Sequence, residues 1–346
     1  MHSWGSYFVL VPKHPFTLRE KTKKMTIPFL SLQHFSVKFN LRSGSIFRRA
    51  SFYAVRDLSV NIHKKETFCM IGESGSGKTT LIWAMLGLIP FYEGEIFFKG
   101  ESIKKRNDPA HKRFKAGAQM VFQDPAASLS PFLTLGQSIE EPLRARGIGK
   151  KERRGTARKL AMETGLSLKL LERRPANVSG GQNQRACIAR ALSTEPDILF
   201  LDEPLTALDA VIQNKIIKLL CKIKKEYPIT SFLITHDLGL VKDIGDTVAV
   251  MYLGRIVETA PVKTFFSDPD TQPCHPYSKA LLSSVLKPGI RSGKPIILQD
   301  EIPSIQHPPA GCPFYTRCSS RLAICKKNMP DKKILSKGHE VLCHLF

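Results

Sequence analysis

Short apolar runs, separated by glycine, proline and charged residues, divide this chain into strand-like and helix-like segments. Apolar residues at alternate positions predict two strands, at about 30–39 and 58–62, which a basic Gly/Ser loop at 42–49 joins into an antiparallel β flap. Further short apolar runs predict strands at residues 67–71, 94–100, 118–122, 198–201 and 231–234. Helical periodicity with charged faces, clearest at 150–171, predicts a helical subdomain at about 124–178. The fold class is therefore α/β, with a mixed sheet flanked by helices.

A glycine-rich stretch between the strand at 67–71 and an apolar helix at 79–88 fits the phosphate-loop pattern G-x-x-x-x-G-K-[ST]. Its glycines let backbone N–H groups turn toward phosphate oxygens, and the helix points its positive dipole end at the same anion. We expect the Lys78 amine at the β- and γ-phosphates and the Thr79 hydroxyl at Mg²⁺. The flanking strand and helix argue against a chance glycine-rich turn. The candidate nucleotide ligands here are Gly72, Glu73, Ser74, Gly75, Ser76, Gly77, Lys78, Thr79 and Thr80.

The β flap supplies a candidate for stacking on the nucleotide base. Phe39 is the first choice and Tyr53 the second, because both aromatic residues lie in the flap region that immediately precedes the phosphate loop. The alternative is that Phe39 packs within the sheet.

Polar residues follow several of the other predicted strands and helix starts. Gln123 ends the strand at 118–122, Asp202 and Glu203 end the strand at 198–201, and His236 follows the strand at 231–234. Carboxylates at the carboxyl ends of parallel strands lie where α/β folds bind ligands. A second anion-binding helix start is predicted at Ser179, Gly180, Gly181 and Gln182, with Ser179 as the N-cap.

Composition changes this picture only slightly. The 346 residues include 52 Lys+Arg against 30 Asp+Glu, so the formal net charge is +22, which suits an anionic partner such as nucleotide, nucleic acid or a lipid surface. The basic residues are scattered and lack the aromatic interleaving of a base-stacking platform. No apolar run approaches the roughly 20 residues of a membrane span. Residues 1–26 are expected to form an N-terminal extension without periodicity.

Taken together, the ordered motifs resemble the ATP-binding cassette of ABC transporters. The resemblance covers about residues 30 to 260 and implies that Asp202, Thr79 and Gln123 hold Mg²⁺, that Glu203 is the general base and that His236 contacts the γ-phosphate. It also implies that Ser179 and the two glycines after it complete the site of an opposite subunit, so that two ATP molecules lie between two cassettes. Val178, Asn183 and Thr206 depart from the usual motifs without removing a phosphate-binding or catalytic group.

A narrower resemblance points to the ATPases of dipeptide and oligopeptide importers. It rests on residues 123–131, 141–143, 251–258 and 275–282. It implies a cassette at 27–265, an importer-type extension at 266–346, two membrane permease subunits, a second and non-identical ATP-binding subunit, and an extracytoplasmic peptide-binding protein that acts indirectly. The expected location is the cytoplasmic face of the bacterial inner membrane, without a nucleic-acid partner. Nickel importers of the same group, and soluble ABC ATPases acting on nucleic acid or ribosomes, are the alternatives.

Four of the eight cysteines gather near the end of the chain, at Cys312, Cys318, Cys325 and Cys343. Their spacing lacks the C-x2-C pair of common zinc sites, although four thiolates can hold either Zn²⁺ or an iron–sulfur cluster. The run around Cys312 and Cys318 resembles importer tails that carry a [4Fe-4S] cluster. We therefore expect the cluster first, zinc second and free thiols third.

Overall fold

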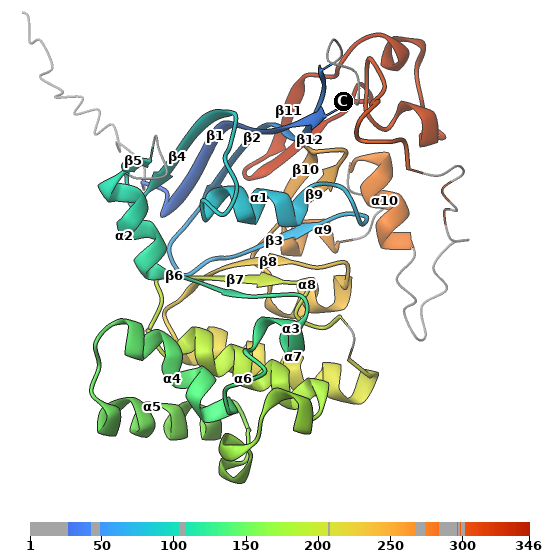
Figure 1. Ribbon diagram of the computed structural model, residues 1–346. Helices are drawn as coiled ribbons and strands as arrows, with labels where there is room; N and C mark the ends of the chain where they lie inside the picture. The colour runs from blue at the N-terminus through green and yellow to red at the C-terminus, as the bar shows by residue number, and fades with distance from the viewer. Residues whose placement is uncertain are drawn as a thin grey trace, which may run out of the picture.

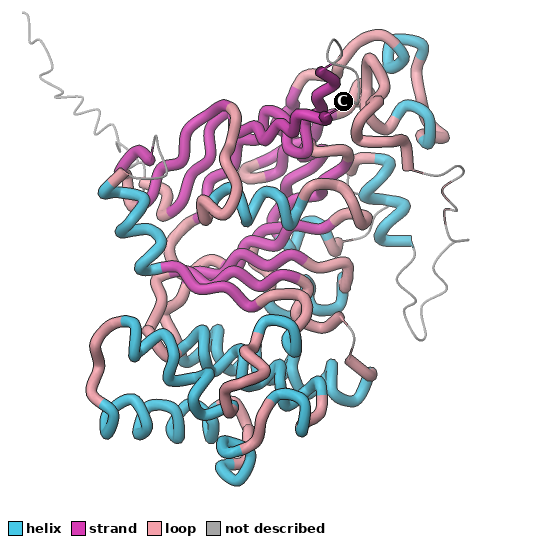
Figure 2. The backbone as a smooth tube through the Cα atoms, in the orientation of Figure 1, coloured by secondary structure: helices cyan, strands magenta, loops and turns pink. Residues whose placement is uncertain are grey.

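The computed structural model describes residues 27–42, 49–103, 108–206, 208–267, 274–283, 296, 298 and 302–346. The predicted N-terminal extension at 1–26 lies outside these residues, as does Ala207. Within the described residues the strands form a four-stranded and an eight-stranded sheet, and most of the helices lie on the far side of the larger sheet from the smaller one (Figures 1 and 2). The predicted mixed sheet flanked by helices and the antiparallel flap are both present.

The larger sheet has the strand order β11-β12-β10-β9-β3-β8-β7-β6. Its strands are β3 (Thr67–Ile71), β6 (Ala118–Val121), β7 (Ile198–Asp202), β8 (Thr230–Ile234), β9 (Thr247–Tyr252), β10 (Arg255–Pro261), β11 (Lys332–Ser336) and β12 (His339–Leu342). The five strands from β9 to β6 are parallel, while β10, β11 and β12 are added in antiparallel pairs. β3 and β7 are buried along their whole length, which explains why they appear in the sequence as unbroken apolar runs.

The smaller sheet is the predicted flap, and it is antiparallel throughout. Its strands are β1 (Leu30–Arg42), β2 (Arg49–Ile62), β4 (Glu93–Phe98) and β5 (Glu101–Ile103). Helix α1 (Lys78–Met85) lies between the two sheets, and its apolar side chains share one buried cluster with the inner faces of both (Figure 1). The start of α1 is thereby fixed between two rigid layers.

A second apolar cluster joins the other face of the larger sheet to most of the remaining cassette helices. These are α4 (Leu135–Ala145), α5 (Lys150–Glu163), η1 (Leu168–Glu172), α6 (Gly180–Leu192), α7 (Ala210–Glu226), α8 (Leu238–Ile244) and α9 (Val262–Phe265). Helix α2 (Pro109–Gly117) packs instead in the first cluster, through Ala110 and Phe114. The short helices α3 (Pro125–Ser128) and η2 (Pro175–Asn177) complete the helical region. The stretch 150–171, where helical periodicity is clearest in the sequence, forms two helices, because Gly165 at φ 70° ends α5 and turns the chain before η1. No helix in the described ranges is long and apolar enough to cross a membrane.

The C-terminal segment packs onto the cassette through one strand and one aromatic cluster. It contains α10 (Pro276–Ser283), η3 (Tyr315–Arg317), η4 (Ala323–Lys326), β11 and β12. β12 extends the larger sheet by pairing with β10, with Val341 opposite Glu258. The buried Phe314 ring lies 5.3 Å from the rings of both Tyr252 and Tyr277, so this segment is continuous with the core that supports the phosphate loop.

Candidate nucleotide-binding and catalytic site

The phosphate loop runs from β3 to α1 with its glycines in close contact with neighbouring backbone. A Cβ atom on Gly72 would lie 2.2 Å from the Met251 carbonyl oxygen, and one on Gly77 would lie 2.1 Å from that of Ala54. Gly77 also has φ 103°, which side chains rarely adopt. The glycines are therefore required by packing against β9 and β2 as well as by the curvature of the loop. Ser76 is buried within the loop, whereas Ser74 and Gly75 are exposed at its outer side and Thr80 is half-buried.

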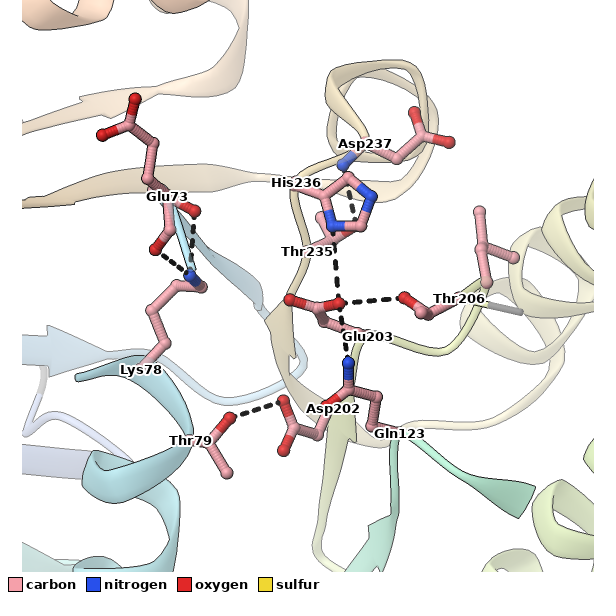
Figure 3. Close-up of polar contacts among 12 residues, drawn as sticks. Glu73, Lys78, Thr79, Gln123, Asp202, Glu203, Thr206, Thr235, His236 and Asp237 are labelled. Atoms are coloured by element: carbon pink, nitrogen blue, oxygen red, sulfur yellow. Dashed lines mark hydrogen bonds and ion pairs between the residues drawn. The ribbon is translucent and has the colours of Figure 1, made fainter. Parts of the chain in front are cut away.

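The Lys78 amine lies across the loop (Figure 3). It donates hydrogen bonds of 2.8 Å to the carbonyl oxygens of Gly72 and Glu73, and it lies 3.4 Å from the Ser76 hydroxyl. Burial lowers the pKa of Lys78, and the nearby carboxylates of Glu203, Asp202 and Glu73 oppose that shift. The result is a positive charge held where the loop would receive phosphate oxygens.

Thr79 and Asp202 bring hard oxygen atoms together beside the loop. The Thr79 hydroxyl donates a 3.2 Å hydrogen bond to the Asp202 carboxylate, which ends β7. Burial raises the pKa of Asp202 from 3.8 to about 6. A buried carboxylate next to a hydroxyl is a donor set that fits Mg²⁺, which prefers oxygen ligands and would compensate the buried negative charge.

The Glu203 carboxylate is the meeting point of three side chains from different elements (Figure 3). Its Oε2 atom accepts hydrogen bonds from the Thr206 hydroxyl at 2.9 Å and from the Gln123 amide at 3.2 Å, and Nδ1 of His236 lies 3.4 Å away. Glu203 itself has φ 47°, and its N–H donates to the Ile234 carbonyl oxygen at 2.8 Å, which turns the side chain out of the line of β7. This geometry suits a carboxylate that orients and deprotonates a water molecule.

Gln123 stands at the junction between the sheet and the helical region. It follows β6, and the next residue, Asp124, caps α3 by accepting hydrogen bonds from the N–H groups of Ala126 and Ala127. Gln123 is therefore separated from the first turn of α3 only by the residue that caps this helix.

The predicted second anion-binding helix start forms, but not at this site. Ser179 is the N-cap of α6, as the sequence predicts, and it makes a reciprocal capping box with Gln182. Gly180 and Gly181 pack against Leu208 and Ile212. Among the described residues, no hydrogen bond joins Ser179–Gln182 to the phosphate loop. The structure thus brings Gln123, Asp202, Glu203 and His236 to the loop and leaves the start of α6 apart from it.

The flap aromatics pack on one another. Phe39 stacks on Phe52 with ring centroids 5.6 Å apart and remains 37% exposed, while Tyr53 contacts Tyr92 edge to face. Base stacking by Phe39 or Tyr53 stays a prediction, and the sheet-packing alternative describes the contact that Phe39 makes here.

Three residues around the site were not anticipated from the sequence. Thr206 orients Glu203 through its hydroxyl, and Tyr277 and Arg317 of the C-terminal segment both contact Glu73. The signal for Thr206 was available, because a hydroxyl three residues after Glu203 stands where the motif usually has serine. For Arg317, 244 residues from its partner in the chain, only the three-dimensional structure shows the contact.

The four C-terminal cysteines are buried and free. Burial raises the pKa of the Cys312 thiol to about 12, with smaller contributions from the other three thiols, and burial also raises the pKa of Cys318 and Cys343. In the ranges that the structure describes, however, no group of three or more His, Cys, Asp or Glu side chains is drawn together closely enough to hold a metal ion. The expected [4Fe-4S] cluster and its zinc alternative are therefore not supported by this arrangement.

A phosphate loop with a buried lysine, hard oxygen ligands beside it and a hydrogen-bonded carboxylate define a nucleoside triphosphatase of the phosphate-loop class. Two family models narrow this class: "ABC transporter" matches residues 55–206, and "Oligopeptide/dipeptide transporter, C-terminal region" matches residues 257–325. The chain belongs to the ATP-binding subunits of the oligopeptide/dipeptide ABC transporter family, and it is an ATP-hydrolysing enzyme.

Relatives match along nearly the whole chain. Oligopeptide transport ATP-binding protein AppF of Bacillus subtilis is 39% identical over 92% of this chain and 97% of its own. The dipeptide transport ATP-binding protein DppD of the same organism is 37% identical, covering 91% and 94% of the two chains. Oligopeptide transport ATP-binding protein OppF of Haemophilus influenzae is also 37% identical, over 91% and 96%.

Solved structures agree with the fold. An ATP-binding cassette solved as a dimer in a post-hydrolysis state with ADP and Pi has a TM-score of 0.61 and 27% identity, covering 67% of this chain and 98% of that one. CbiO1 from Clostridium perfringens, part of an ABC transporter complex, has a TM-score of 0.60 and 27% identity, covering 69% and 90%.

Proposed function

We propose that this chain is the ATP-hydrolysing motor of a membrane importer for dipeptides or oligopeptides. The observation that carries the proposal is the hydrogen bond between Gln123 and Glu203, because it joins the catalytic carboxylate to the residue from which the helical region begins. A motor needs such a connection, so that a change at the γ-phosphate alters the position of a docking surface. The peptide substrate is supported by relatives named for oligopeptide and dipeptide transport.

The proposed hydrolysis uses the residues gathered at the phosphate loop. Lys78 exchanges its loop carbonyl partners for oxygens of the β- and γ-phosphates. Thr79 and Asp202 are the residues that would hold Mg²⁺, with Gln123 beside them, and the bound ion would neutralise charge on the transferring phosphate. Glu203, oriented by the Thr206 hydroxyl, accepts a proton from the attacking water, while His236 contacts the γ-phosphate.

A second cassette completes the site in this proposal. Ser179, Gly180, Gly181 and Gln182 form a capped helix start that contacts no part of the chain's own phosphate loop within the described residues. Supplied to a facing subunit, the same helix start would place backbone N–H groups against its γ-phosphate. The similar cassette solved as a dimer supports this assembly, and we propose a non-identical partner subunit.

The proposed membrane partners are two permease subunits that dock on the helical subdomain at about 124–178. A groove beside this region is lined by residues of the helical subdomain, Glu141 and Pro142 among them, and by apolar side chains that include Leu88 and Phe122. Phe132 at the edge of the same region is 81% exposed. We propose that the chain lies at the cytoplasmic face of the cell membrane, peripheral to it. The extracytoplasmic peptide-binding protein would act indirectly, and we propose no nucleic-acid partner.

We also propose a division into a cassette at 27–265 and an extension at 266–346.

The transport proposal is tested in the native host by replacing the chain with its Glu203→Gln variant and measuring uptake of labelled di- and oligopeptides and of ⁶³Ni²⁺. Loss of peptide uptake alone supports the proposal, loss of nickel uptake alone identifies a nickel importer instead, and unchanged uptake of both rejects a transport role for these substrates. Co-purification with membrane permeases supports the transport role, whereas co-purification with ribosomes or nucleic acid supports the alternative of a soluble ABC ATPase.

A further inference from the structure

Glu73, the second residue of the phosphate loop, is held from outside by the C-terminal segment. Its carboxylate forms a two-point ion pair with Arg317, at 2.7 Å from Oε2 to Nη1 and 3.0 Å from Oε1 to Nη2. Its backbone N–H donates a 3.0 Å hydrogen bond to the Tyr277 hydroxyl. Its backbone carbonyl, in contrast, points inward and accepts the 2.8 Å hydrogen bond from Lys78 (Figure 3). Three groups of one residue thus connect the C-terminal segment to the phosphate-binding lysine.

The C-terminal partners of Glu73 are themselves rigidly placed. The Arg317 side chain is only 6% exposed and lies over the Tyr252 ring, with 5.9 Å from Cζ to the ring centroid. Arg317 ends η3, whose first residues follow the buried Phe314. The Tyr277 ring is fully buried, 4.8 Å from the Tyr252 ring. A guanidinium that binds a carboxylate through two hydrogen bonds fixes both the position and the orientation of that carboxylate. Arg317 therefore holds the Glu73 side chain in one geometry and does not act only through its charge.

The anchoring of η3 reaches the four C-terminal cysteines. The Tyr315 N–H donates to the Cys312 carbonyl oxygen at 3.0 Å, and the Cys312 N–H donates to that of Cys325 at 2.9 Å. Gly311 lies so close to the Cys325 carbonyl oxygen that a Cβ atom there would be 2.4 Å away. The backbone contacts of the cysteine-containing turns therefore fix the position of η3, which carries Arg317.

We propose that Arg317 is a positioning residue for nucleotide binding, which holds Glu73 and thereby sets the shape of the phosphate loop, so that the C-terminal segment controls the affinity of the cassette for ATP. Glu73 serves the nucleotide through its backbone and not through its carboxylate, which faces Arg317. This inference concerns ATP affinity and holds whatever the importer transports.

The decisive experiment compares loop-positioning variants of the full chain in equilibrium titrations with Mg²⁺ and the non-hydrolysable analogue AMP-PNP. Arg317→Ala should weaken binding about 3- to 30-fold, the range seen for residues that act on a site without touching the ligand. Arg317→Lys, which keeps the charge but not the two-point grip, should recover only part of this loss. Tyr277→Phe, which removes one hydroxyl, should give a smaller loss in the same direction.

Glu73→Gln separates positioning from simple charge repulsion. If Arg317 merely neutralises a carboxylate near the phosphates, then Glu73→Gln should bind AMP-PNP at least as tightly as wild type, and this result would overturn the proposal. Positioning requires that Glu73→Gln also bind more weakly, because an amide cannot accept both guanidinium hydrogen bonds. The double variant Glu73→Gln/Arg317→Lys should then bind AMP-PNP no more weakly than whichever single variant binds it less tightly, because both substitutions affect the same interaction.

The matched control is Arg321→Ala, which removes an exposed guanidinium from the same segment that contacts Tyr315 and the Thr316 carbonyl and does not reach Glu73. It should bind AMP-PNP as wild type does. In steady-state hydrolysis, the Arg317 variants should raise KM for ATP several-fold and leave kcat within about twofold. A drop in kcat without a change in KM or in AMP-PNP affinity, in variants whose circular dichroism is native, would reject the positioning role.

Discussion

The Gln123 amide donates a 3.2 Å hydrogen bond to the Glu203 carboxylate across 80 residues of chain. The two residues follow adjacent parallel strands, β6 and β7, so the contact arises directly from the sheet order. It means that the residue which would activate water and the residue which leads into α3 share one hydrogen bond. A ligand that competes for either side chain must alter the other.

Replacing Gln123 by alanine should uncouple hydrolysis from transport. Removal of the amide leaves Glu203 its bond to Thr206 but breaks the only side-chain link from Glu203 to the junction with α3 in the described residues. In proteoliposomes with the permeases, peptide uptake should fall more than ATP hydrolysis. Gln33→Ala, at an exposed position of β1, is the control and should change neither rate. Wild-type uptake and coupling in the Gln123 variant would remove the hinge role.

Glu203→Gln should reduce steady-state hydrolysis by roughly 10²- to 10⁴-fold, because a positioned general base is lost. ATP binding should persist, since Lys78 and Thr79 are untouched. Turnover is measured in the assembled transporter and binding by titration. Glu226→Gln, which breaks an exposed i,i+4 pair with Lys222, should leave turnover unchanged. Near-normal turnover in the Glu203 variant would show that Glu203 is not the general base.

Asp202→Asn should stabilise the nucleotide-free protein at alkaline pH. Burial raises the folded-state pKa of Asp202 from 3.8 to about 6, so its ionisation destabilises the folded state above pH 6 by on the order of 3 kcal/mol, and this penalty disappears as pH falls through 6 toward 3.8. Urea unfolding with EDTA should therefore show the variant more stable than wild type at pH 8, with the difference shrinking toward pH 4. The Asn side chain can still accept the Thr79 hydrogen bond.

The ligand dependence of this effect supplies its control. Mg²⁺ with AMP-PNP should reverse the order of stability, because the ionised carboxylate of the wild type then gains a cation. A pH-independent difference between the two proteins would contradict the raised pKa as its cause.

The purified chain alone should be a poor ATPase whose activity rises when a partner cassette is added. Ser179→Ala should lower the hydrolysis at the partner's site by at least about tenfold, as the loss of a fixed phosphate donor does elsewhere. Ser167→Ala, at an exposed helix start that makes no side-chain cap bond, is the matched control. Full activity from a monodisperse monomer, independent of concentration, would exclude a site shared between subunits.

The sequence was sufficient wherever structure is encoded locally. The phosphate loop and the Ser179 N-cap follow from short patterns. The placement of Asp202, Glu203 and His236 at one sheet edge follows because parallel buried strands end at a common edge. Periodicity predicted helical structure at 150–171 but not the break within it, which the left-handed Gly165 produces.

Short sequence patterns could not predict contacts between segments that are far apart in the chain. Glu73 was predicted as a nucleotide ligand from its motif position, and nothing local indicates that its carboxylate faces Arg317. The cysteine spacing predicted metal ligands, yet spacing does not determine whether four thiols converge once η3 and η4 have packed. Both questions depend on how the last segment meets the cassette.

The pairing of β12 with β10 has a consequence for shortened forms of this protein. A chain that stopped before His339 would leave the backbone N–H and C=O groups of β10 exposed as an open sheet edge, and such edges recruit strands from other molecules. In the structure described here, β11 is the outermost strand at this edge of the larger sheet, and its Lys332 and Lys333 are exposed to solvent. Like charges there discourage edge-to-edge aggregation, so the final strands protect the solubility of the cassette.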